Sequence, residues 1–396
     1  MNRVLRLGLV AVSVAACSGG PILANPPAAQ PPVPVPTEAP VRPADPRPIA
    51  FPRDDGPHDR LMEWWYHTGH LRSDDDRHFG FEYVIFRAER GTLPTLWAAH
   101  LAITDETGGT FDYAQRTEIG PQVDRSPRDA SGEPTGLDLS LAGVAPIDPS
   151  TSHRAPWTMG SRLAGNDTYQ LTAFADPGRS TVTTGQGRLG LDLTTRPTKP
   201  PALHDTDGWI DFGPAGGSYY YSRTANDAAG TLYLGSDTVP VDGTAWFDHQ
   251  WGDFITFGGG GWDWFAVNLA DGTDITLFLV RDADGSYPIV YGTHVDARGV
   301  TRHLPGDAFA VTATNTWTSP SSGATYPAGW TIQLPAEDLT IELQPTVADQ
   351  ELDTRTSTGV VYWEGSQVVR ARRGDLELGG EAYVELTGYG PAGLAP

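Results

Sequence analysis

EWWYHTGHL at residues 63–71, followed after a short turn by FGFEYVIFR at 79–87, decides the fold of this chain. Both stretches are rich in aromatic and β-branched residues and are typical of β-strands. Similar short apolar segments, most of them closed by Gly, Pro, Asn or Asp, recur at 96–105, 168–174, 275–280, 339–345 and 382–389. No stretch of ten or more residues shows the 3.6-residue period of a helix. The sequence therefore predicts an all-β fold, in which consecutive hairpins hide their edges by closing into barrels.

The two halves of the chain resemble each other. DWFAVNL followed by TDITLFLVR, at 263–281, repeats the order found at 63–87. In both, an acidic residue and two aromatic residues lead through a turn into an apolar strand that ends in Arg281 or Arg87. An internal duplication would explain this likeness.

Two further pairs of segments keep the same order along the chain. Trp157 precedes TYQLTAF as Trp330 precedes LTIELQP, and GGSYYYSRT at 216–224 is paired with GGEAYVELT at 379–387. Chance likeness between β-proteins is the alternative explanation. The pattern predicts two tandem antiparallel barrels, residues 54–228 and 229–396.

The first residues resemble a bacterial lipoprotein signal. Arg3 and Arg6 precede the apolar run 7–16, which is too short to span a bilayer, and the string VAAC resembles a lipobox ending at Cys17. Residues 1–16 are therefore expected to be removed and Cys17 to be lipidated, with a plain secretory signal as the alternative. A serine rather than an aspartate follows the cysteine, so we expect a cell-envelope lipoprotein, on the outer membrane where the host has one.

The region after the lipobox is rich in Pro and Ala. Residues 17–53 are expected to form a disordered, partly polyproline II tether. The chain carries 27 Lys plus Arg against 49 Asp plus Glu, a net charge of −22. We therefore predict no nucleic-acid partner, because phosphate binding needs basic patches.

Several strings carry a resemblance to a known family. They are EWWYHTGHL, AHLAITD (99–105), SYYYSR (218–223), AWFDHQWGDF (245–254), GWDWFAVNL (261–269), DQEL (349–352), YWEG (362–365) and YVELTGY (383–389). With them the chain resembles the AttH-type family, which includes the carotenoid 1,2-hydratases and bacterial proteins known only as predicted secreted hydrolases. The resemblance implies two lipocalin-like β-barrel domains. It does not settle the reaction, because the family also holds fungal relatives that shape polyketide substrates and members with no known activity.

The string AWFDHQWGDF offers a candidate catalytic site. If it is extended, Phe247, His249, Trp251 and Asp253 share one face, and Trp246, Asp248, Gln250 and Phe254 share the other. Hydration of an isolated alkene needs a protonated acid, which a carboxyl in an apolar cavity can supply, and an aromatic face to stabilise the cation. The predicted catalytic residues are His249, Trp251, Asp253 and Asp248. The alternative is structural, with Asp248 and His249 pinning a turn and the tryptophans filling a core.

The resemblance to carotenoid hydratases is incomplete. His249 and Trp251 match the His-x-Trp element of those enzymes. They are also expected to carry an acidic residue on the next strand but one, where this chain has Leu277, Phe278 and Val280. The departure puts carotenoid hydration in doubt, so Asp248 or Asp253 would have to serve as the acid.

The aromatic load of the chain favours a hydrophobic ligand cavity in a barrel over a solid core. The residues predicted to bind the ligand are Trp65, His67, His100, Tyr221 and Trp264. A zinc site made by Glu63, His67 and His100 is sterically open, but we favour a satisfied polar cluster and predict no metal and no cofactor.

Two functions remain open from the sequence. The first is a hydratase-, lyase- or isomerase-type enzyme that uses acid chemistry on an isoprenoid- or lipid-like molecule. The second is a carrier lipoprotein that holds such a molecule without catalysis, with an envelope transporter as its partner. A serine hydrolase of the α/β type is excluded because no GxSxG string occurs.

Overall fold

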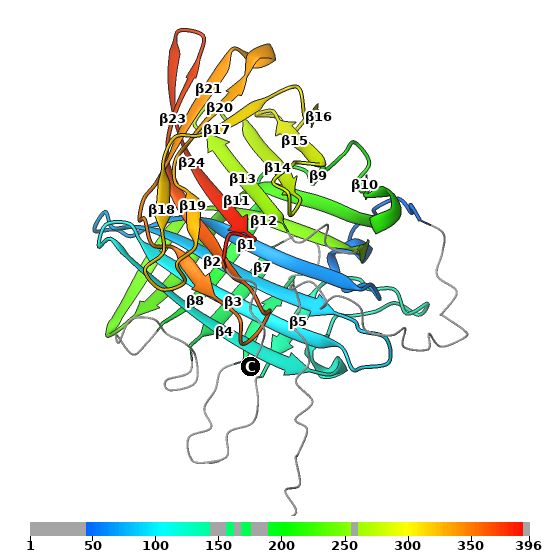
Figure 1. Ribbon diagram of the computed structural model, residues 1–396. Helices are drawn as coiled ribbons and strands as arrows, with labels where there is room; N and C mark the ends of the chain where they lie inside the picture. The colour runs from blue at the N-terminus through cyan, green and yellow to red at the C-terminus, as the bar shows by residue number, and fades with distance from the viewer. Residues whose placement is uncertain (1–44, 143–155, 162–167, 176–188, 255–259, 391–396) are drawn as a thin grey trace, which may run out of the picture.

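The computed structural model describes residues 45–142, 156–161, 168–175, 189–254 and 260–390. Their regular structure is almost entirely β-strand, interrupted by single 3-10 turns at η1 (Arg53–Asp55), η2 (Pro121–Val123), η4 (Gly213–Ala215) and η5 (Pro335–Glu337). The strands form two large antiparallel sheets, the first coloured blue to green and the second yellow-green to red in Figure 1. In these ranges no helix has the length and apolar character to cross a membrane. The predicted all-β fold is confirmed.

The first sheet has the order β4-β3-β2-β1-β12-β11-β8-β7-β6-β5, and β9 and β10 also pair with β11. Its strands are β1 (Met62–Arg72), β2 (His78–Ala88), β3 (Leu96–Asp105), β4 (Thr110–Ile119), β5 (Asp138–Leu141), β6 (Trp157–Gly160), β7 (Tyr169–Phe174), β8 (Leu189–Pro197), β9 (Ala202–Leu203), β10 (Trp209–Asp211), β11 (Gly216–Leu234) and β12 (Asp237–Phe254). The sheet curls so that its inner face closes around one hydrophobic core.

The second sheet has the order β16-β15-β14-β13-β24-β23-β21-β20-β17, with β22 paired to β23. Its strands are β13 (Gly261–Leu269), β14 (Asp274–Arg281), β15 (Ile289–Val295), β16 (Thr301–Pro305), β17 (Ala310–Ala313), β20 (Trp330–Leu334), β21 (Leu339–Pro345), β22 (Glu351–Asp353), β23 (Val361–Arg373) and β24 (Leu376–Thr387). A separate hairpin joins β18 (Thr316–Thr318) to β19 (Thr325–Pro327). This sheet encloses a core of its own, so two barrel-like units stand in tandem.

The same strand order occurs in both sheets. In the first, β1 lies between β2 and β12, with β11 beyond; in the second, β13 lies between β14 and β24, with β23 beyond. This repetition agrees with the predicted duplication and with the pairing of 63–87 with 263–281. The two further pairings predicted from the sequence, GGSYYYSRT with GGEAYVELT and Trp157 with Trp330, are each displaced by one strand. GGSYYYSRT lies on β11, the counterpart of β23 and not of β24, and Trp330 opens β20, the counterpart of β7 and not of β6.

The change from the first sheet to the second comes later than the sequence suggested. The expected boundary between residues 228 and 229 falls inside β11. The next strand, β12, pairs along its length with both β1 and β11 and therefore belongs to the first barrel. The second barrel starts with β13, after Phe254. The duplicated strings identify similar strands in the two halves, but they do not reveal the long hairpin of β11 and β12 that closes the first barrel.

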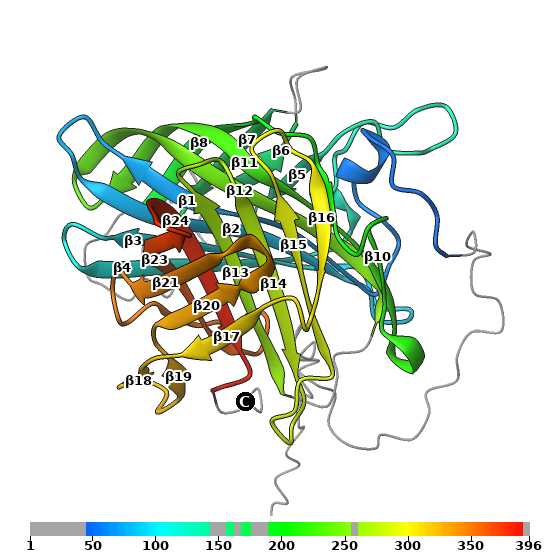
Figure 2. The same cartoon turned by 90° about the horizontal axis from the view of Figure 1, so that it is seen from above.

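A third hydrophobic cluster lies between the two barrels. Along β1, Trp65 points into the first barrel, whereas Tyr66 points outward and packs against Trp264 of the second sheet. Figure 2 shows the strands of the two sheets crossing at this contact. Both faces of β1 and β2 are therefore covered, which explains why FGFEYVIFR reads as a nearly continuous apolar run.

The last part of the predicted tether packs on the first barrel. Residues 1–44, which include Cys17 and the expected signal, lie outside the described residues. Residues 45–53 pack on the first barrel, where Ile49 joins its core and the ring of Phe51 meets Tyr221 edge-on at 4.8 Å. Asp45 and Arg60 form an ion pair at 2.7 Å that fixes the start of this segment. Scattered apolar and charged side chains in a Pro-rich string are enough to dock it.

Candidate functional site

The predicted site residues lie on opposite sides of the first sheet. Along β12, His249 and Trp251 point into the first barrel, whereas Asp248 points to the second sheet, in agreement with the predicted alternation. Of the residues expected to bind ligand, Trp65, His67 and Tyr221 lie inside the first barrel, and His100 and Trp264 lie between the barrels. The structure therefore contains two candidate sites instead of one.

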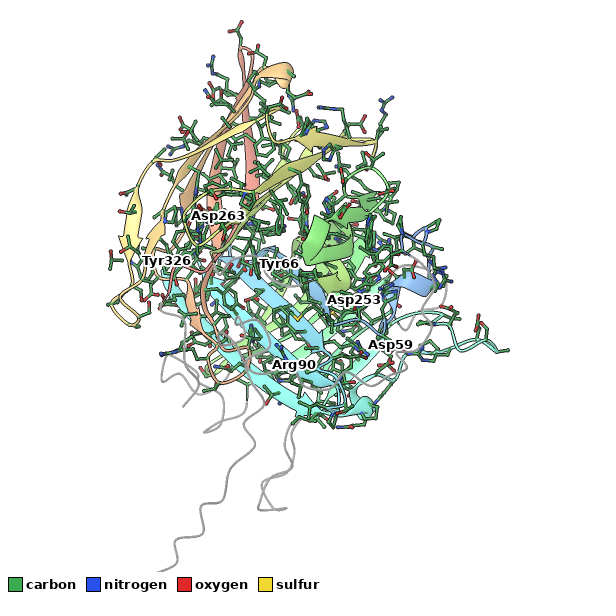
Figure 3. All side chains as sticks on the ribbon, turned by 45° about the vertical axis from the view of Figure 1, so that its right-hand side comes forward. Asp59, Tyr66, Arg90, Asp253, Asp263 and Tyr326 are labelled. Carbon is green, nitrogen blue, oxygen red and sulfur yellow. The ribbon has the colours of Figure 1, made fainter. Side chains whose placement is uncertain are left out.

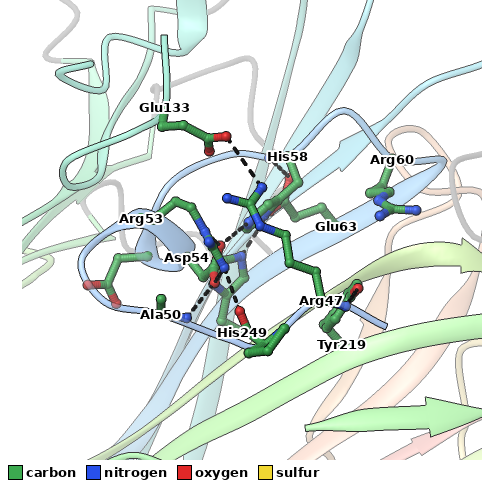
Figure 4. A network of polar contacts seen from close by, with 12 residues as sticks. Arg47, Ala50, Arg53, Asp54, His58, Arg60, Glu63, Glu133, Tyr219 and His249 are labelled. Atoms are coloured by element: carbon green, nitrogen blue, oxygen red, sulfur yellow. Dashed lines mark hydrogen bonds and ion pairs between the residues drawn. The ribbon is translucent and has the colours of Figure 1, made fainter. Parts of the chain in front are cut away.

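Inside the first barrel, Glu63 joins two histidines. Its Oε1 lies 2.7 Å from His58 Nδ1 and 2.9 Å from His249 Nε2. Figure 4 shows the three residues close together. The backbone N–H of His58 donates to the other carboxylate oxygen, Oε2, at 2.9 Å. Burial would raise the pKa of Glu63, but the two imidazoles outweigh it and hold this pKa at about 2. Glu63 is thus a fixed anion between two rings.

The far side of each imidazole is also held. His58 Nε2 lies 3.2 Å from Asp54 Oδ1. His249 Nδ1 lies 3.4 Å from the hydroxyl of Tyr221, which donates to Asp55 Oδ1 at 2.7 Å. On the side away from Glu63, Asp54 therefore orients the His58 ring directly. Asp55 orients the His249 ring through the Tyr221 hydroxyl.

Indole rings fix the planes of the two histidines. Trp251 stacks on His58 with centroids 4.2 Å apart and planes 2° from parallel. Trp65 stacks on His249 at 4.8 Å. Trp251 therefore faces a protein ring in this structure, and the barrel interior around it is filled.

His67 lies deeper in the same barrel. Its ring packs against Phe247 at 4.5 Å and Tyr169 at 5.3 Å. Among the described residues neither ring nitrogen has a hydrogen-bond partner, and burial lowers the pKa of His67 to about 3. It is a neutral imidazole in an aromatic core.

Asp253 does not join His249 and Trp251. Its carboxylate accepts from Arg60 Nη1 at 2.8 Å and from the backbone N–H of Leu61 at 3.0 Å. Figure 3 places it at the edge of the first barrel, away from Tyr66. Asp253 shares the strand face of His249 and Trp251 by spacing, but β12 ends at the next residue and the Asp253 carboxylate pairs with the docked N-terminal segment.

A cavity lies between the two barrels rather than inside either of them. Its volume is about 30 Å³, the room of a water molecule. Its lining is aromatic with a few polar groups: Trp64, Tyr66, Glu82, Val84, Phe86, Tyr220, Asp248, Gln250, Trp262, Trp264, Phe278 and Glu385. The sequence predicts a ligand cavity in a barrel, whereas this cavity lies between two sheets.

Two glutamates, Glu82 and Glu385, line this cavity, and a third, Glu364, is bonded to its wall; each has an aromatic partner. Trp262 Nε1 donates to Glu385 at 3.1 Å, and the Tyr362 hydroxyl donates to Glu82 at 2.8 Å. Tyr66 donates to Glu364 at 2.6 Å. One oxygen of Glu82 and one of Glu364 have no partner among the described residues.

Burial favours the protonated form of these carboxyls. Burial raises the pKa of Glu385 to about 7. Burial also raises the pKa of Glu82 and that of Glu364, and the charge of Glu385 raises both further. Several like charges in one apolar space cannot all ionise, so part of this cluster is protonated near neutral pH.

Asp248 lies in the wall of the same cavity and is surrounded by donors. The Tyr220 and Ser222 hydroxyls donate to it, as does Trp246 Nε1 at 2.6 Å. Burial raises its pKa to about 6 despite these hydrogen bonds. Trp264, which the sequence predicts to bind the ligand, donates from Nε1 to the Tyr220 hydroxyl at 3.0 Å. It therefore fixes the position of Tyr220, the hydrogen-bond partner of Asp248.

The AttH-like family model matches residues 42–389, nearly all of the described chain. The chain belongs to the AttH-like family. The family resemblance seen in the sequence is confirmed.

Solved structures share the two-barrel fold. A putative AttH protein from Nitrosomonas europaea is 28% identical with a TM-score of 0.70, and the match covers 89% of this chain and all of that one. Kievitone hydratase from Nectria haematococca is 16% identical with a TM-score of 0.59, covering 86% and 93% of the two chains, and shows likeness of fold. A dehydratase of Emericella nidulans, asqC, is 24% identical over 177 residues, 43% of this chain. The chain spans about half the length of that curated relative.

In this AttH-like protein acidic side chains reach the cavity from strands other than β14. Phe278 and Val280 face the other barrel and Leu277 the second core, so no acid reaches the cavity from these positions. Glu82 on β2 and Glu385 on β24 line it instead. Sequence reasoning missed both. The available signal was that Glu82 is the lone acidic residue of the apolar strand β2 and that Glu385 directly follows the apolar residues Tyr383 and Val384 of β24.

The zinc site weighed from the sequence cannot form. His100 lies on the outer face of the first sheet, with Nδ1 2.7 Å from the Tyr362 hydroxyl and Nε2 3.0 Å from Ser357 Oγ. Glu63 and His67 point into the barrel on the opposite face. One sheet therefore separates His100 from the other two.

Proposed function

We propose that this protein adds water to a carbon–carbon double bond of a hydrophobic small molecule, or forms such a bond by eliminating water. The substrate binds between the two barrels, where the cavity of about 30 Å³ widens to admit it. The observation that carries the proposal is the aromatic cavity that Glu82, Glu385 and Asp248 line together. Protonated carboxyls in such a space can deliver a proton to carbon or to a leaving hydroxyl.

Glu385 is the proposed acid. It lines the cavity, and Trp262 orients one of its oxygens. In hydration, the carboxylic proton goes to one alkene carbon, water adds its oxygen to the other, and the proton lost by that water returns to a carboxylate of the cavity. The rings of Trp64 and Trp264 are placed to stabilise the cationic carbon. Elimination is the same sequence in reverse.

The relatives are in accord with this chemistry. One solved structure of the same fold is a hydratase, and the curated relative is a dehydratase. We propose a related reaction here on an isoprenoid- or lipid-like substrate. The catalytic roles predicted for His249, Trp251 and Asp253 are not part of this proposal, whereas Asp248 holds Tyr220 at the cavity wall.

Oxygen-18 water tests the reaction. The full chain is incubated with a panel of isoprenoid alkenes and the matching alcohols, and label uptake is followed by mass spectrometry. We expect uptake that falls at least about 100-fold in Glu385→Gln, the scale of a lost general acid. Glu377→Gln, an exposed change on the same strand, is the control. Full turnover in Glu385→Gln, or no uptake with any compound, counts against the proposal.

A carrier function is the second candidate, favoured by the aromatic lining of the cavity. A compound that quenches tryptophan fluorescence at a saturable site without any turnover would support it. We also propose export and attachment through lipidated Cys17. Labelling of cells with a tagged fatty acid should mark the wild-type chain and not Cys17→Ser.

A further inference from the structure

We propose that His58, Glu63 and His249 form a binding site for a divalent transition-metal ion of the zinc class inside the first barrel. The donor atoms are His58 Nδ1, Glu63 Oε1 and His249 Nε2, and all lie within 4.8 Å of one another. This site is separate from the cavity between the barrels and does not depend on the reaction proposed there.

The three side chains reach one point from three places in the chain. Glu63 is on β1 and His249 on the neighbouring β12, where their Cα atoms are two positions apart in the strand register. His58 comes from the segment that precedes β1. Strand spacing therefore did not single out this group, because one ligand lies outside any strand.

Two imidazole nitrogens and one carboxylate oxygen are a donor set that zinc ions accept. The chain has no thiolate in its described part, which leaves this N/O set. Tetrahedral zinc lies about 2.0–2.2 Å from each donor atom, which places the donors about 3.3–3.6 Å from one another. The two separations between Glu63 and the histidines, 2.7 and 2.9 Å, would widen by a few tenths of an ångström to admit the ion. Binding would release to solvent the protons now shared between Glu63 and the rings.

The groups behind the ligands argue for a metal site over a simple ion pair. Histidines that bind metals usually give their second ring nitrogen to a carboxylate, either directly or through another group. His58 Nε2 meets Asp54 in this way, and His249 Nδ1 meets Tyr221, which is bonded to Asp55. A salt bridge to Glu63 would not require both far nitrogens to be held.

The site can also be reached by water. The His58 side chain is 18% exposed, whereas Glu63 and His249 are fully buried. An ion held by three protein atoms would therefore take water on the side of His58. The stacking of Trp251 on His58 keeps that ring in place.

Metal binding is tested on the full chain, first stripped with a chelator and then titrated with Co²⁺ and Zn²⁺. We expect one equivalent to bind, with a four-coordinate Co²⁺ absorption spectrum that Zn²⁺ displaces. Affinity should fall at least about 100-fold in His58→Ala, beyond the effect of losing a supporting group. His78→Ala, which changes a partly exposed histidine outside the cluster, is the control and should bind as the wild type does.

X-ray absorption of the wild-type protein keeps the test valid if a variant fails to fold. A shell of nitrogen and oxygen atoms with two imidazoles supports the site. No binding by the wild type, equal binding by His58→Ala, or a metal shell without imidazole would overturn it.

Discussion

The Tyr66 hydroxyl of the first barrel donates a hydrogen bond to Glu364 of the second at 2.6 Å. The relationship is reciprocal, since Tyr362 of the second barrel donates to Glu82 of the first at 2.8 Å. Two tyrosine–glutamate pairs therefore cross the contact between the barrels in opposite directions. They hold the carboxyls in an apolar space and tie the barrels together.

Removal of the Tyr66 hydroxyl should weaken that contact. In Tyr66→Phe the Glu364 oxygen loses its donor while it stays buried, and we expect the free energy of unfolding to fall by about 1–3 kcal/mol. Urea unfolding of Tyr66→Phe, Glu364→Gln and the double variant gives the coupling energy. Additive effects of the two changes would show that the pair contributes nothing as a pair.

Glu385 should make the protein less stable as the pH rises. Its pKa is about 7 in the folded chain against a usual 4.5, so above pH 4.5 the folded state binds more protons than the unfolded state. The stability that this proton gives is complete below about pH 4.5 and is lost as the pH rises through 7. Glu385→Gln should therefore gain about 1–3 kcal/mol over the wild type between pH 5 and pH 8. The exposed Glu377→Gln should show no such gain, and equal pH profiles of all three proteins would contradict the assignment.

The local pattern of the strands could be predicted from the sequence. Strand alternation correctly placed His249 and Asp248 on opposite faces of one strand, and the likeness of 63–87 to 263–281 is a likeness of strand hairpins. Alternation says which residues share a face but not what covers it. Both faces of the first sheet are buried, the inner one in the barrel core and the outer one against the second barrel. A candidate site therefore lies on each face.

The cavity itself could not be predicted. Glu82 and Tyr362 meet across 280 positions of sequence, through the packing of two barrels whose relative placement no local pattern encodes. The same holds for His58, which reaches Glu63 from an irregular segment. Asp253 shares a strand face with Trp251 by spacing, yet the docked Arg60 decides its partner.

The proposed reaction should itself depend on pH. Glu385 must be protonated to act as the acid, so kcat/KM should fall about tenfold per unit above pH 7. An aspartate at this position would hold its carboxyl farther from the substrate and should lower kcat more than it raises KM. A rate that keeps rising from pH 7 to pH 9 would mean that a different group donates the proton.

Two buried histidines should respond in opposite ways to the same substitution. His67 has no hydrogen-bond partner among the described residues, whereas both ring nitrogens of His100 are bonded. In His67→Phe an apolar ring replaces an unsatisfied one between Phe247 and Tyr169, so the free energy of unfolding should stay equal or rise by about 1 kcal/mol. In His100→Phe the Tyr362 and Ser357 hydroxyls lose a partner, and stability should fall by about 1–3 kcal/mol. Urea unfolding of the two variants measures the difference. A large loss in His67→Phe would mean that its nitrogens are bound in solution, by water or by a ligand inside the first barrel.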